Sequence, residues 1–294
     1  MTLAPITPKG EARRAQLVEG EFHFTAEDFR TIAATLHTAA GIALPDSKAT
    51  LVYSRLAKRL RALGLECFRD YCALVTGDHG LDERQRMIVA LTTNVTRFFR
   101  EPHHFDHLSE KVLPPLLAQA KRGGEVRIWS AGCSNGQEAY SIGLTILSLM
   151  PDAADYNVRI LATDIDTQML AEGRAGLYAE QLVEPIPADF RSRWFHREPD
   201  GWRVSEPLRR LVTFNELNLI GQWPIKRRFQ AIFCRNVVIY FEEETQSQVF
   251  SRFLPLMTPD ARLYIGHSER VCGPAAAQMA TDGVTTYRLR SALQ

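Results

Sequence analysis

The stretch VRIWSAGCSNGQE, residues 126–138, decides the fold. It begins with an apolar run of strand length, residues 126–131, and leads into an apolar helix predicted over residues 137–150. Between them lie Gly132 and Gly136, which let the backbone turn tightly and approach a ligand closely. A strand, a glycine-containing turn and a helix in this order predict the first βα unit of a parallel sheet.

The same alternation continues towards the C-terminus. The predicted strands are residues 158–163, 229–234 and 263–266, the predicted helices are 167–175 and 245–256, and residues 285–289 could close the sheet at its edge. Strands that alternate with helices indicate a mostly parallel sheet covered on both faces, which is a doubly wound α/β domain.

This rhythm breaks between about residues 176 and 214. There the chain contains WFHR at 194–197, a Pro-Asp-Gly turn at 199–201 and WRV at 202–204. Two short runs around such a turn predict a β-hairpin. We expect a small antiparallel β insertion within the larger domain.

The N-terminal part has a different pattern. Residues 1–20 contain prolines and glycines without apolar periodicity and are expected to be a mobile leader. Helical periodicity over residues 21–90, with Thr25 as N-cap and Asp28 three residues on, predicts a small all-helical domain. Residues 91–102 would link it to the larger domain, residues 103–294.

Composition limits the possible functions. The 294 residues are 45% hydrophobic and carry a formal net charge of +1, so the whole chain is not drawn electrostatically to nucleic acid or membrane. Five cysteines without a CxxC pair fit reduced thiols. Because no signal peptide and no run of 18 apolar residues is present, we expect a soluble, cytoplasmic protein.

A basic cluster lies on the second predicted helix. Its members are Lys48, Arg55, Lys58, Arg59 and Arg61, and no acid lies among them. Arg55 and Arg59 share one face because they are four residues apart. This face is either an ordinary solvated surface or a docking site for an acidic helical partner, and the charges alone leave both open.

The glycine loop lacks the sequence motifs that bind phosphate groups. It contains neither GxGxxG nor a Gly-Lys-Ser/Thr sequence, so recognition of a pyrophosphate or triphosphate is poorly supported. Glu138, in the first turn of the following helix, suits a cationic or amine-bearing ligand. A cofactor without phosphates is therefore favoured.

Further polar residues follow the other strands, where a doubly wound sheet binds its ligands. Asp164 is placed to hold a ribose diol, whereas Asp166 is better explained as the N-cap of the next helix. Asn218 and Leu219 follow the next strand and could read an adenine edge. The apolar strand 229–234 runs into Arg235 and Asn236, and then Tyr240, which indicates an active-site floor. A capping Asn and a half-exposed Tyr are the alternative.

The linking segment lies within a hydroxyl- and amide-rich stretch, TTNVTRFFREPHHF at residues 92–105, whose polar side chains could fold over a cofactor. His103 and His104 are adjacent, so they rarely point to one ion, and we identify no third ligand nearby. We expect no metal.

Taken together, these segments resemble the CheR family of chemotaxis receptor methyltransferases. The resemblance rests on TNVTRFFRE (93–101), WSAGCSNGQE (129–138), TDID (163–166), FCRNV through IYF (233–241) and GHSE (266–269), and it covers residues 25–290. It departs in the glycine loop, where the family usually reads Ser-Thr-Gly-Glu-Glu-Pro and this chain has Gln at 137.

The resemblance implies a Rossmann-like class I methyltransferase domain that binds S-adenosylmethionine and releases S-adenosylhomocysteine. The implied cofactor residues are Asn94, Thr96, Arg100, Glu138, Asp164, Asn218, Leu219, Arg235 and Asn236. Tyr240 would lie near the transferred methyl group and orient the acceptor, and Arg100 or Arg235 would hold a carboxylate.

The implied reaction is methyl transfer to glutamate carboxylates of chemotaxis receptors, with Arg55, Lys58 and Arg59 docking on their cytoplasmic helical region. The loop at 198–201 looks shorter than in relatives that bind a receptor C-terminal pentapeptide, so we expect recognition without that tether. We expect a monomer that binds no nucleic acid and reaches the membrane only through the receptor. A methyltransferase with another acceptor, or a non-catalytic adaptor that binds the cofactor or its product, remain alternatives.

Overall fold

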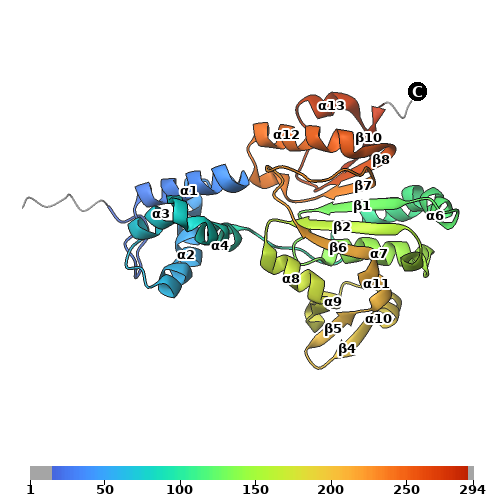
Figure 1. Cartoon of the computed structure of the whole chain (residues 1–294), viewed down its shortest axis with the longest axis horizontal. Coiled ribbons are helices and arrows are strands. Elements are labelled where there is room, and N and C mark those ends of the chain that lie inside the picture. The colour runs from blue at the N-terminus through green and yellow to red at the C-terminus, as the bar shows by residue number, and fades with distance from the viewer. Residues whose placement is uncertain (1–14, 291–294) are drawn as a thin grey trace, which may run out of the picture. The chain divides into compact units, whose positions relative to one another are not determined.

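The computed structural model describes residues 15–290, which form two compact units (Figure 1). The first contains residues up to Leu91, except 40–42, and the second contains residues 40–42 and those from Thr92 onward. Most of the expected leader, residues 1–14, lies outside the described residues. Within the remainder, the Leu17 N–H donates to the Phe24 carbonyl at 2.7 Å, so this part of the expected leader pairs with the first unit. No helix among the described residues combines the length and apolar character needed to span a membrane.

The first unit is helical, as predicted. Its helices are α1 (Ala26–Ala40), α2 (Ala49–Leu63), α3 (Phe68–Thr76) and α4 (Leu81–Leu91), with short 3-10 turns at Asp46–Lys48 and Asp78–Gly80. The predicted N-cap is confirmed: Thr25 Oγ1 accepts the Asp28 N–H at 3.2 Å, and the Asp28 carboxylate accepts the Thr25 N–H at 2.9 Å. Such a reciprocal pair satisfies two donors that a helix start leaves open.

The second unit is built on a seven-stranded sheet in the order β6-β2-β1-β7-β8-β10-β9. The strands are β1 (Val126–Ala131), β2 (Val158–Asp164), β6 (Val212–Glu216), β7 (Phe229–Cys234), β8 (Met257–Ile265), β9 (Met279–Gly283) and β10 (Thr286–Leu289). The first five strands in this order are parallel, and β10 is antiparallel to both β8 and β9. The carboxyl ends of the parallel strands therefore meet at one edge of the sheet, here called the carboxyl edge.

Helices cover both faces of this sheet. They are α5 (His103–His107), a π turn (Leu108–Val112), α6 (Leu113–Lys121), α7 (Gln137–Leu149), α8 (Thr167–Ala175), α12 (Glu243–Phe253) and α13 (Pro274–Gln278), with 3-10 turns at Ala153–Asp155, Val238–Tyr240 and Leu254–Leu256. Alternate residues of β1 enter different cores: Ile128 packs with α6 and α7, whereas Trp129 packs with α12. This two-sided burial explains why β1 reads as a continuous apolar run.

Two sequence expectations need correction. The edge strand is β9, because β10 lies between β8 and β9, and β9 has the sequence MATDG, whose weak apolar pattern does not mark it as a strand. Strand β8 begins at Met257 and not at Leu263, because Pro259 and Asp260 are tolerated where the pairing with β7 is irregular.

The predicted insertion is a three-stranded antiparallel sheet in the order β3-β5-β4. It consists of β3 (Leu177–Tyr178), α9 (Glu180–Val183), α10 (Ala188–Trp194), β4 (Phe195–Glu198), β5 (Gly201–Val204) and α11 (Glu206–Leu211). The hairpin of β4 and β5 was predicted, whereas β3 and the three short helices were not. Only Pro199 and Asp200 join the hairpin strands.

Candidate functional site

Asp164 joins two loops at the carboxyl edge. Its carboxylate accepts the Ser134 N–H at 2.7 Å from the glycine loop and the Asp166 N–H at 2.9 Å. Burial raises the pKa of Asp164, and these two backbone hydrogen bonds oppose that rise. The residue stays partly exposed, so a fixed carboxylate at the end of β2 faces the place where a doubly wound sheet binds its ligand.

Asp166 is the N-cap of α8, as predicted. Its Oδ1 accepts the N–H groups of Gln168 and Met169 at 2.9 and 3.1 Å. Its Oδ2 accepts a hydrogen bond from the Asn94 amide at 2.7 Å, and the Asn94 carbonyl accepts one from Ser134 Oγ at 3.1 Å. Asn94 thus fastens the linking segment to the loops after β1 and β2, and Thr96 beside it is partly exposed.

The linking segment is also fastened to α7. Gln137 Oε1 accepts the Phe98 N–H at 3.1 Å, and Ser141 Oγ accepts the Phe99 N–H at 2.9 Å. Gln137 Nε2 donates to Asn135 Oδ1 at 3.1 Å. The glutamine uses both a donor and an acceptor, which an acid at this position could not do. The contacts of Gln137 and Ser141 with the linking segment were not predicted, because the sequence does not show which loop lies against α7.

Arg235 lies in a buried ion network. Its side chain is 1% exposed, with Nη1 3.2 Å from Glu138 Oε2 and Nη2 3.3 Å from Glu101 Oε2. Nη2 also donates to the Arg100 carbonyl, and Ser130 Oγ donates to Glu138 Oε1 at 2.7 Å. Burial raises the pKa of Glu138, and Arg235 counteracts this rise.

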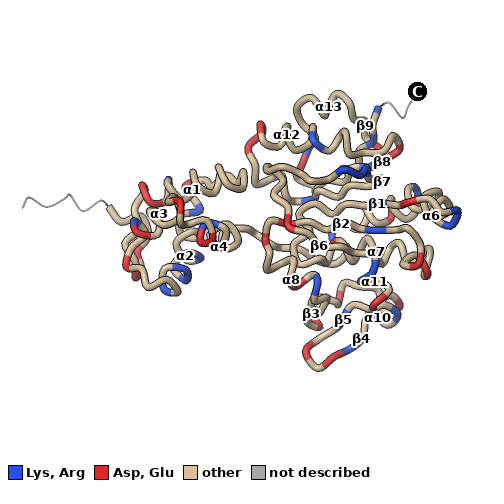
Figure 2. The backbone as a smooth tube through the Cα atoms, viewed as in Figure 1, with Lys and Arg blue, Asp and Glu red and all other residues tan. Residues whose placement is uncertain are grey.

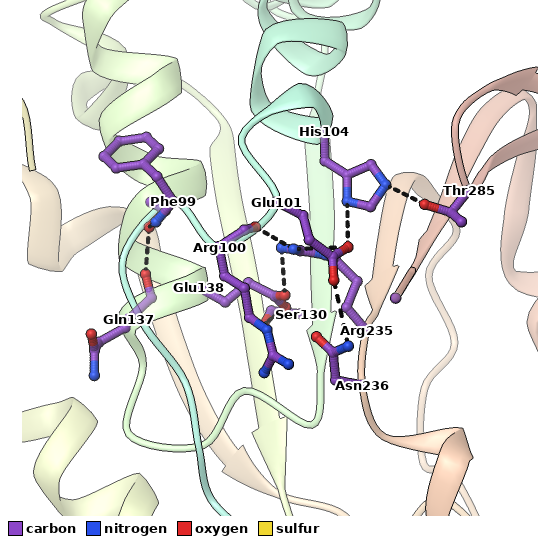
Figure 3. Close-up of polar contacts among 12 residues, drawn as sticks. Phe99, Arg100, Glu101, His104, Ser130, Gln137, Glu138, Arg235, Asn236 and Thr285 are labelled. Carbon is purple, nitrogen blue, oxygen red and sulfur yellow. Dashed lines mark hydrogen bonds and ion pairs between the residues drawn. The ribbon is translucent and has the colours of Figure 1, made fainter. Parts of the chain in front are cut away.

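The sequence left open whether Arg100 or Arg235 holds a ligand carboxylate, and this network distinguishes the two. Arg235 already binds two carboxylates, so it could hold a ligand carboxylate only by giving up one of them. Arg100 is partly exposed, and among the described residues its guanidinium donates to the Val95 carbonyl, at 2.9 Å. In Figure 3 its side chain extends away from the Glu101 carboxylate. Arg100 is therefore the better candidate for holding a ligand carboxylate.

Glu101 was not among the predicted site residues, although it contacts Arg235, Asn236 and His267. Its Oε1 accepts hydrogen bonds from His267 Nδ1 at 2.9 Å and from Asn236 Nδ2 at 3.4 Å. Burial opposes its ionisation, but the hydrogen bonds from His267 and the charge of Arg235 outweigh burial and lower its pKa to about 2. Burial and Arg235 lower the pKa of His104 to about 3, so His104 is neutral at pH 7.

Contrary to the expectation from the sequence, a third possible metal ligand, Glu101, lies near His103 and His104. Ligand atoms of Glu101, His103 and His104 lie within 4.8 Å of one another. However, the Arg235 guanidinium lies beside Glu101, and His104 Nε2 already contacts Thr285 Oγ1 at 2.9 Å. The adjacent positive charge disfavours a cation at this cluster.

The loop after β7 carries Asn236 and Tyr240. Asn236 has a φ of 59°, in the left-handed region that Asn tolerates better than most residues. Tyr240 ends a 3-10 turn and is partly exposed. Beneath this loop lies the buried carboxylate of Glu269, which sequence reasoning left without a role.

Asn218 and Leu219 follow β6. Asn218 Oδ1 accepts the Ile220 N–H at 3.1 Å, which forms a local turn. The Leu219 side chain is buried, and its carbonyl accepts a hydrogen bond from Arg252 Nη1 at 2.9 Å. These contacts fix the loop backbone at the carboxyl edge.

The basic face of α2 is partly engaged within the helical unit. Arg59 Nε and Nη2 donate to both carboxylate oxygens of Glu83 at 2.9 and 2.6 Å, and this pairing raises the Arg59 pKa. Arg55 Nη1 donates to the Ala90 carbonyl at 3.3 Å, and Lys58 is exposed. The basic residues of α2 are visible in Figure 2. The sequence showed no acid nearby because the acid comes from α4.

The carboxyl edge fits a nucleoside cofactor that carries positive charge and no phosphate. Its carboxylates are the partly exposed Asp164 and, both paired with Arg235, Glu101 and Glu138. Carboxylates at a ligand site favour an ammonium or sulfonium group and repel phosphate.

Comparisons with known proteins agree with this reading. Residues 94–285 match the family model "CheR methyltransferase, SAM binding domain", and residues 27–92 match "CheR methyltransferase, all-alpha domain". A probable chemotaxis protein methyltransferase of Rhizobium etli is 54% identical over 257 residues, which cover 86% of this chain and 96% of that protein. Chemotaxis protein methyltransferase 2 of Pseudomonas aeruginosa is 43% identical over 85% of this chain and 88% of its own length. The chemotaxis protein methyltransferase of Salmonella typhimurium is 39% identical, with 89% of each chain covered.

Proposed function

This chain belongs to the CheR methyltransferase family, and on that premise we propose that it methylates glutamate side chains of chemotaxis receptors. It is an S-adenosylmethionine-dependent methyltransferase. The observation that carries the proposal is that Arg235 is buried in ion pairs, whereas Arg100 is partly exposed. Arg235 is committed to Glu101 and Glu138, which leaves Arg100 and Tyr240 as partly exposed polar groups beside the carboxyl edge.

We assign the cofactor contacts as follows. Asp164 would hold the ribose, the loop of Asn218 and Leu219 the adenine, and Arg100 the cofactor carboxylate. Asn94, Thr96, Glu138, Arg235 and Asn236 would shape the pocket around them. When bound, S-adenosylmethionine supplies a methyl group on a positively charged sulfur.

A glutamate acceptor fits this site because it needs no general base. The reference pKa of Glu is near 4.3, so the attacking carboxylate is already ionised at neutral pH. The residues then have to align the acceptor, for which we assign Tyr240, and to exclude water, for which we assign the linking segment. Alignment of reacting groups can lower a barrier by about 7–11 kcal/mol. Charge is lost as the carboxylate attacks, so a water-poor site favours the step.

The receptor is expected to dock through its cytoplasmic helical region on α2. Lys58 is the exposed cation of the three predicted docking residues, whereas Arg55 and Arg59 have partners within the helical unit. The tight hairpin turn of Pro199 and Asp200 supports recognition without a C-terminal tether. We propose a monomeric enzyme that acts in the cytoplasm, binds no nucleic acid and meets the membrane only through its receptor.

The test uses tritiated methyl donor and a receptor cytoplasmic fragment. Glutamate methyl esters release volatile labelled methanol in alkali, whereas methylated amines do not. We expect label that is alkali-labile and that is lost when the acceptor glutamates are changed to glutamine. Alkali-stable label would indicate a different acceptor. Saturable cofactor binding without transfer to any receptor fragment would indicate an adaptor.

A further inference from the structure

Glu269 holds the backbone of the loop that follows β7. The residue is 4% exposed. Its Oε2 accepts the N–H groups of Asn236 at 2.9 Å and Gly266 at 2.5 Å, and its Oε1 accepts those of Val237 at 2.9 Å and Ile239 at 3.4 Å. One buried carboxylate thus satisfies backbone donors on two loops, those after β7 and β8.

The pattern of acceptors requires a carboxylate. Each oxygen of Glu269 faces two N–H donors, so an amide in its place would direct an NH2 group at two donors in either orientation. Buried backbone N–H groups left without an acceptor cost free energy. Glutamine has nearly the same shape but cannot replace this residue.

The space around Glu269 is equally restricted. A Cβ atom added at Gly266 would lie 2.4 Å from Asn236 Nδ2, 2.8 Å from the Asn236 backbone nitrogen and 2.8 Å from Glu269 Oε2. The absence of a side chain at Gly266 therefore lets the two loops approach each other. Asn236, in its left-handed conformation, is held on the backbone by Glu269 and on the side chain by Glu101.

The loop held in this way carries residues that we place at the reaction centre. Tyr240 directly follows Ile239, the last donor to Glu269, and its own N–H donates to the Val237 carbonyl at 3.3 Å. A shift of the loop would move Asn236 and Tyr240 together. Displacements of about 1 Å at a reacting centre can reduce rates about a hundredfold.

We propose that Glu269 is a positioning residue for methyl transfer, which fixes the backbone of residues 236–239 so that Asn236 and Tyr240 face the bound cofactor. This inference rests on the proposed roles of Asn236 and Tyr240. Glu269 itself lies beneath the loop and acts through it.

The first test is binding of S-adenosylhomocysteine by calorimetry, which requires no acceptor. We expect Glu269→Gln and Gly266→Ala each to weaken binding at least fivefold, because they disturb the same contact from opposite sides. Asp282→Asn is the matched control: Asp282 is also a largely buried carboxylate of this unit, but it pairs with Arg262 and His107. The Asp282→Asn variant should have a lower melting temperature than the wild type and a binding constant within twofold of the wild-type value.

The second test is a double-mutant cycle on the rate constant of transfer, kcat, with Tyr240→Phe. If Glu269 acts through the loop, Tyr240→Phe should cost at least threefold less in a Glu269→Gln background than in the wild type. Independent, multiplicative losses would overturn the proposal, as would wild-type binding in both loop variants or an equal loss in Asp282→Asn. If Glu269→Gln does not fold, Gly266→Ala decides both tests. Binding of the product is measured without a receptor, so a wrong acceptor assignment would leave the first test intact.

Discussion

Glu101 and Arg235 form a buried ion pair, with 3.3 Å between Oε2 and Nη2 and with the Arg235 side chain 1% exposed. Glu101 belongs to the linking segment and Arg235 to the end of β7, so the pair fastens that segment to the sheet. On its other side Arg235 meets Glu138 at 3.2 Å. The same arginine therefore organises three chain segments around the carboxyl edge.

Removal of Arg235 should be strongly destabilising. Arg235→Met would leave Glu101 and Glu138 buried without a cation, and breaking such a pair costs about 3–5 kcal/mol. Urea unfolding measures the free energy. The control is Arg227→Met, because Arg227 is 67% exposed and its pair with Glu125 should contribute at most about 1 kcal/mol. Equal losses in both variants would contradict the role of the network.

Stability should fall as the pH falls below neutrality. The folded state holds the His104 pKa near 3 against an ordinary 6.5, so the unfolded chain binds the proton first and stability is lost from about pH 6.5 downward. A single such proton contributes a slope of at most about 1.4 kcal/mol per pH unit. In His104→Gln, which can retain the contact to Thr285, urea unfolding should show a shallower slope between pH 6.5 and 4.5. An unchanged slope would contradict the assignment.

A second loss should follow at lower pH. Glu101 has a pKa of about 2 against an ordinary 4.5, so its stabilisation is complete above pH 4.5 and is lost as the pH falls towards 2. Glu101→Gln should be less stable than the wild type at pH 6, and the difference should narrow by pH 3. If the difference in unfolding free energy between the two proteins stayed constant from pH 6 to pH 3, the charge of Glu101 would not contribute to stability.

Gln137 should not tolerate the family's usual acid by itself. Gln137→Glu removes the donor to Asn135 and adds a charge next to Glu138, so we expect a loss of about 1–3 kcal/mol in unfolding free energy. Adding Asn135→Thr restores a donor that can reach the new carboxylate. The double variant should recover part of the loss in thermal unfolding, and a further loss would contradict this coupling.

The predicted docking face can be tested with Lys58, the exposed member. Lys58→Glu should raise the KM for a receptor fragment several-fold at low salt, and the effect should shrink at high salt because exposed charges are screened. The control is Lys121→Glu, at an exposed position of α6. Equal effects of both reversals would support the ordinary solvated surface. Arg59→Glu is less informative, because it also leaves Glu83 without its partner.

The sequence predicted those elements whose patterns are determined by burial. Residues 126–131 and 229–234 are strands within the predicted bounds, since both are apolar runs in the middle of the sheet. The helix at 167–175 was predicted with its cap, because Asp166 precedes it directly. Strand β9 was not predicted, because the composition of MATDG does not indicate a strand and the segment is a strand through its pairing with β10.

The candidate site was predictable as a set of positions but not as a network. The residues after β1, β2 and β7 could be placed at one edge from topology alone. The enclosure of Arg235 by Glu101 and Glu138 could not be predicted from topology. These three residues meet through the left-handed turns at Phe99 and Glu101, with φ of 52° and 57°. Glu269 was recognised in a motif, but its backbone partners depend on how closely the loops after β7 and β8 approach.

Tyr240 and Arg100 separate the chemical step from binding. Tyr240→Phe should lower kcat by roughly ten- to a hundredfold, about 1.4–2.7 kcal/mol, and leave the affinity for S-adenosylhomocysteine nearly unchanged. Arg100→Ala should mainly weaken that affinity. Steady-state kinetics with a receptor fragment, together with calorimetry, distinguish the two effects. Unchanged rates in both variants would remove these assignments.

The central claim, that Asp164 holds the cofactor ribose at the carboxyl edge, is tested most directly by calorimetry with S-adenosylhomocysteine and its 2′-deoxy analogue. The wild type should prefer the ribose form by at least tenfold, since the Asp164 carboxylate loses its hydroxyl partner in the complex with the deoxy ligand, which costs affinity. In Asp164→Ala, binding should weaken and the preference should disappear. A wild type that binds both ligands equally, or a variant that keeps the full preference, would contradict the account.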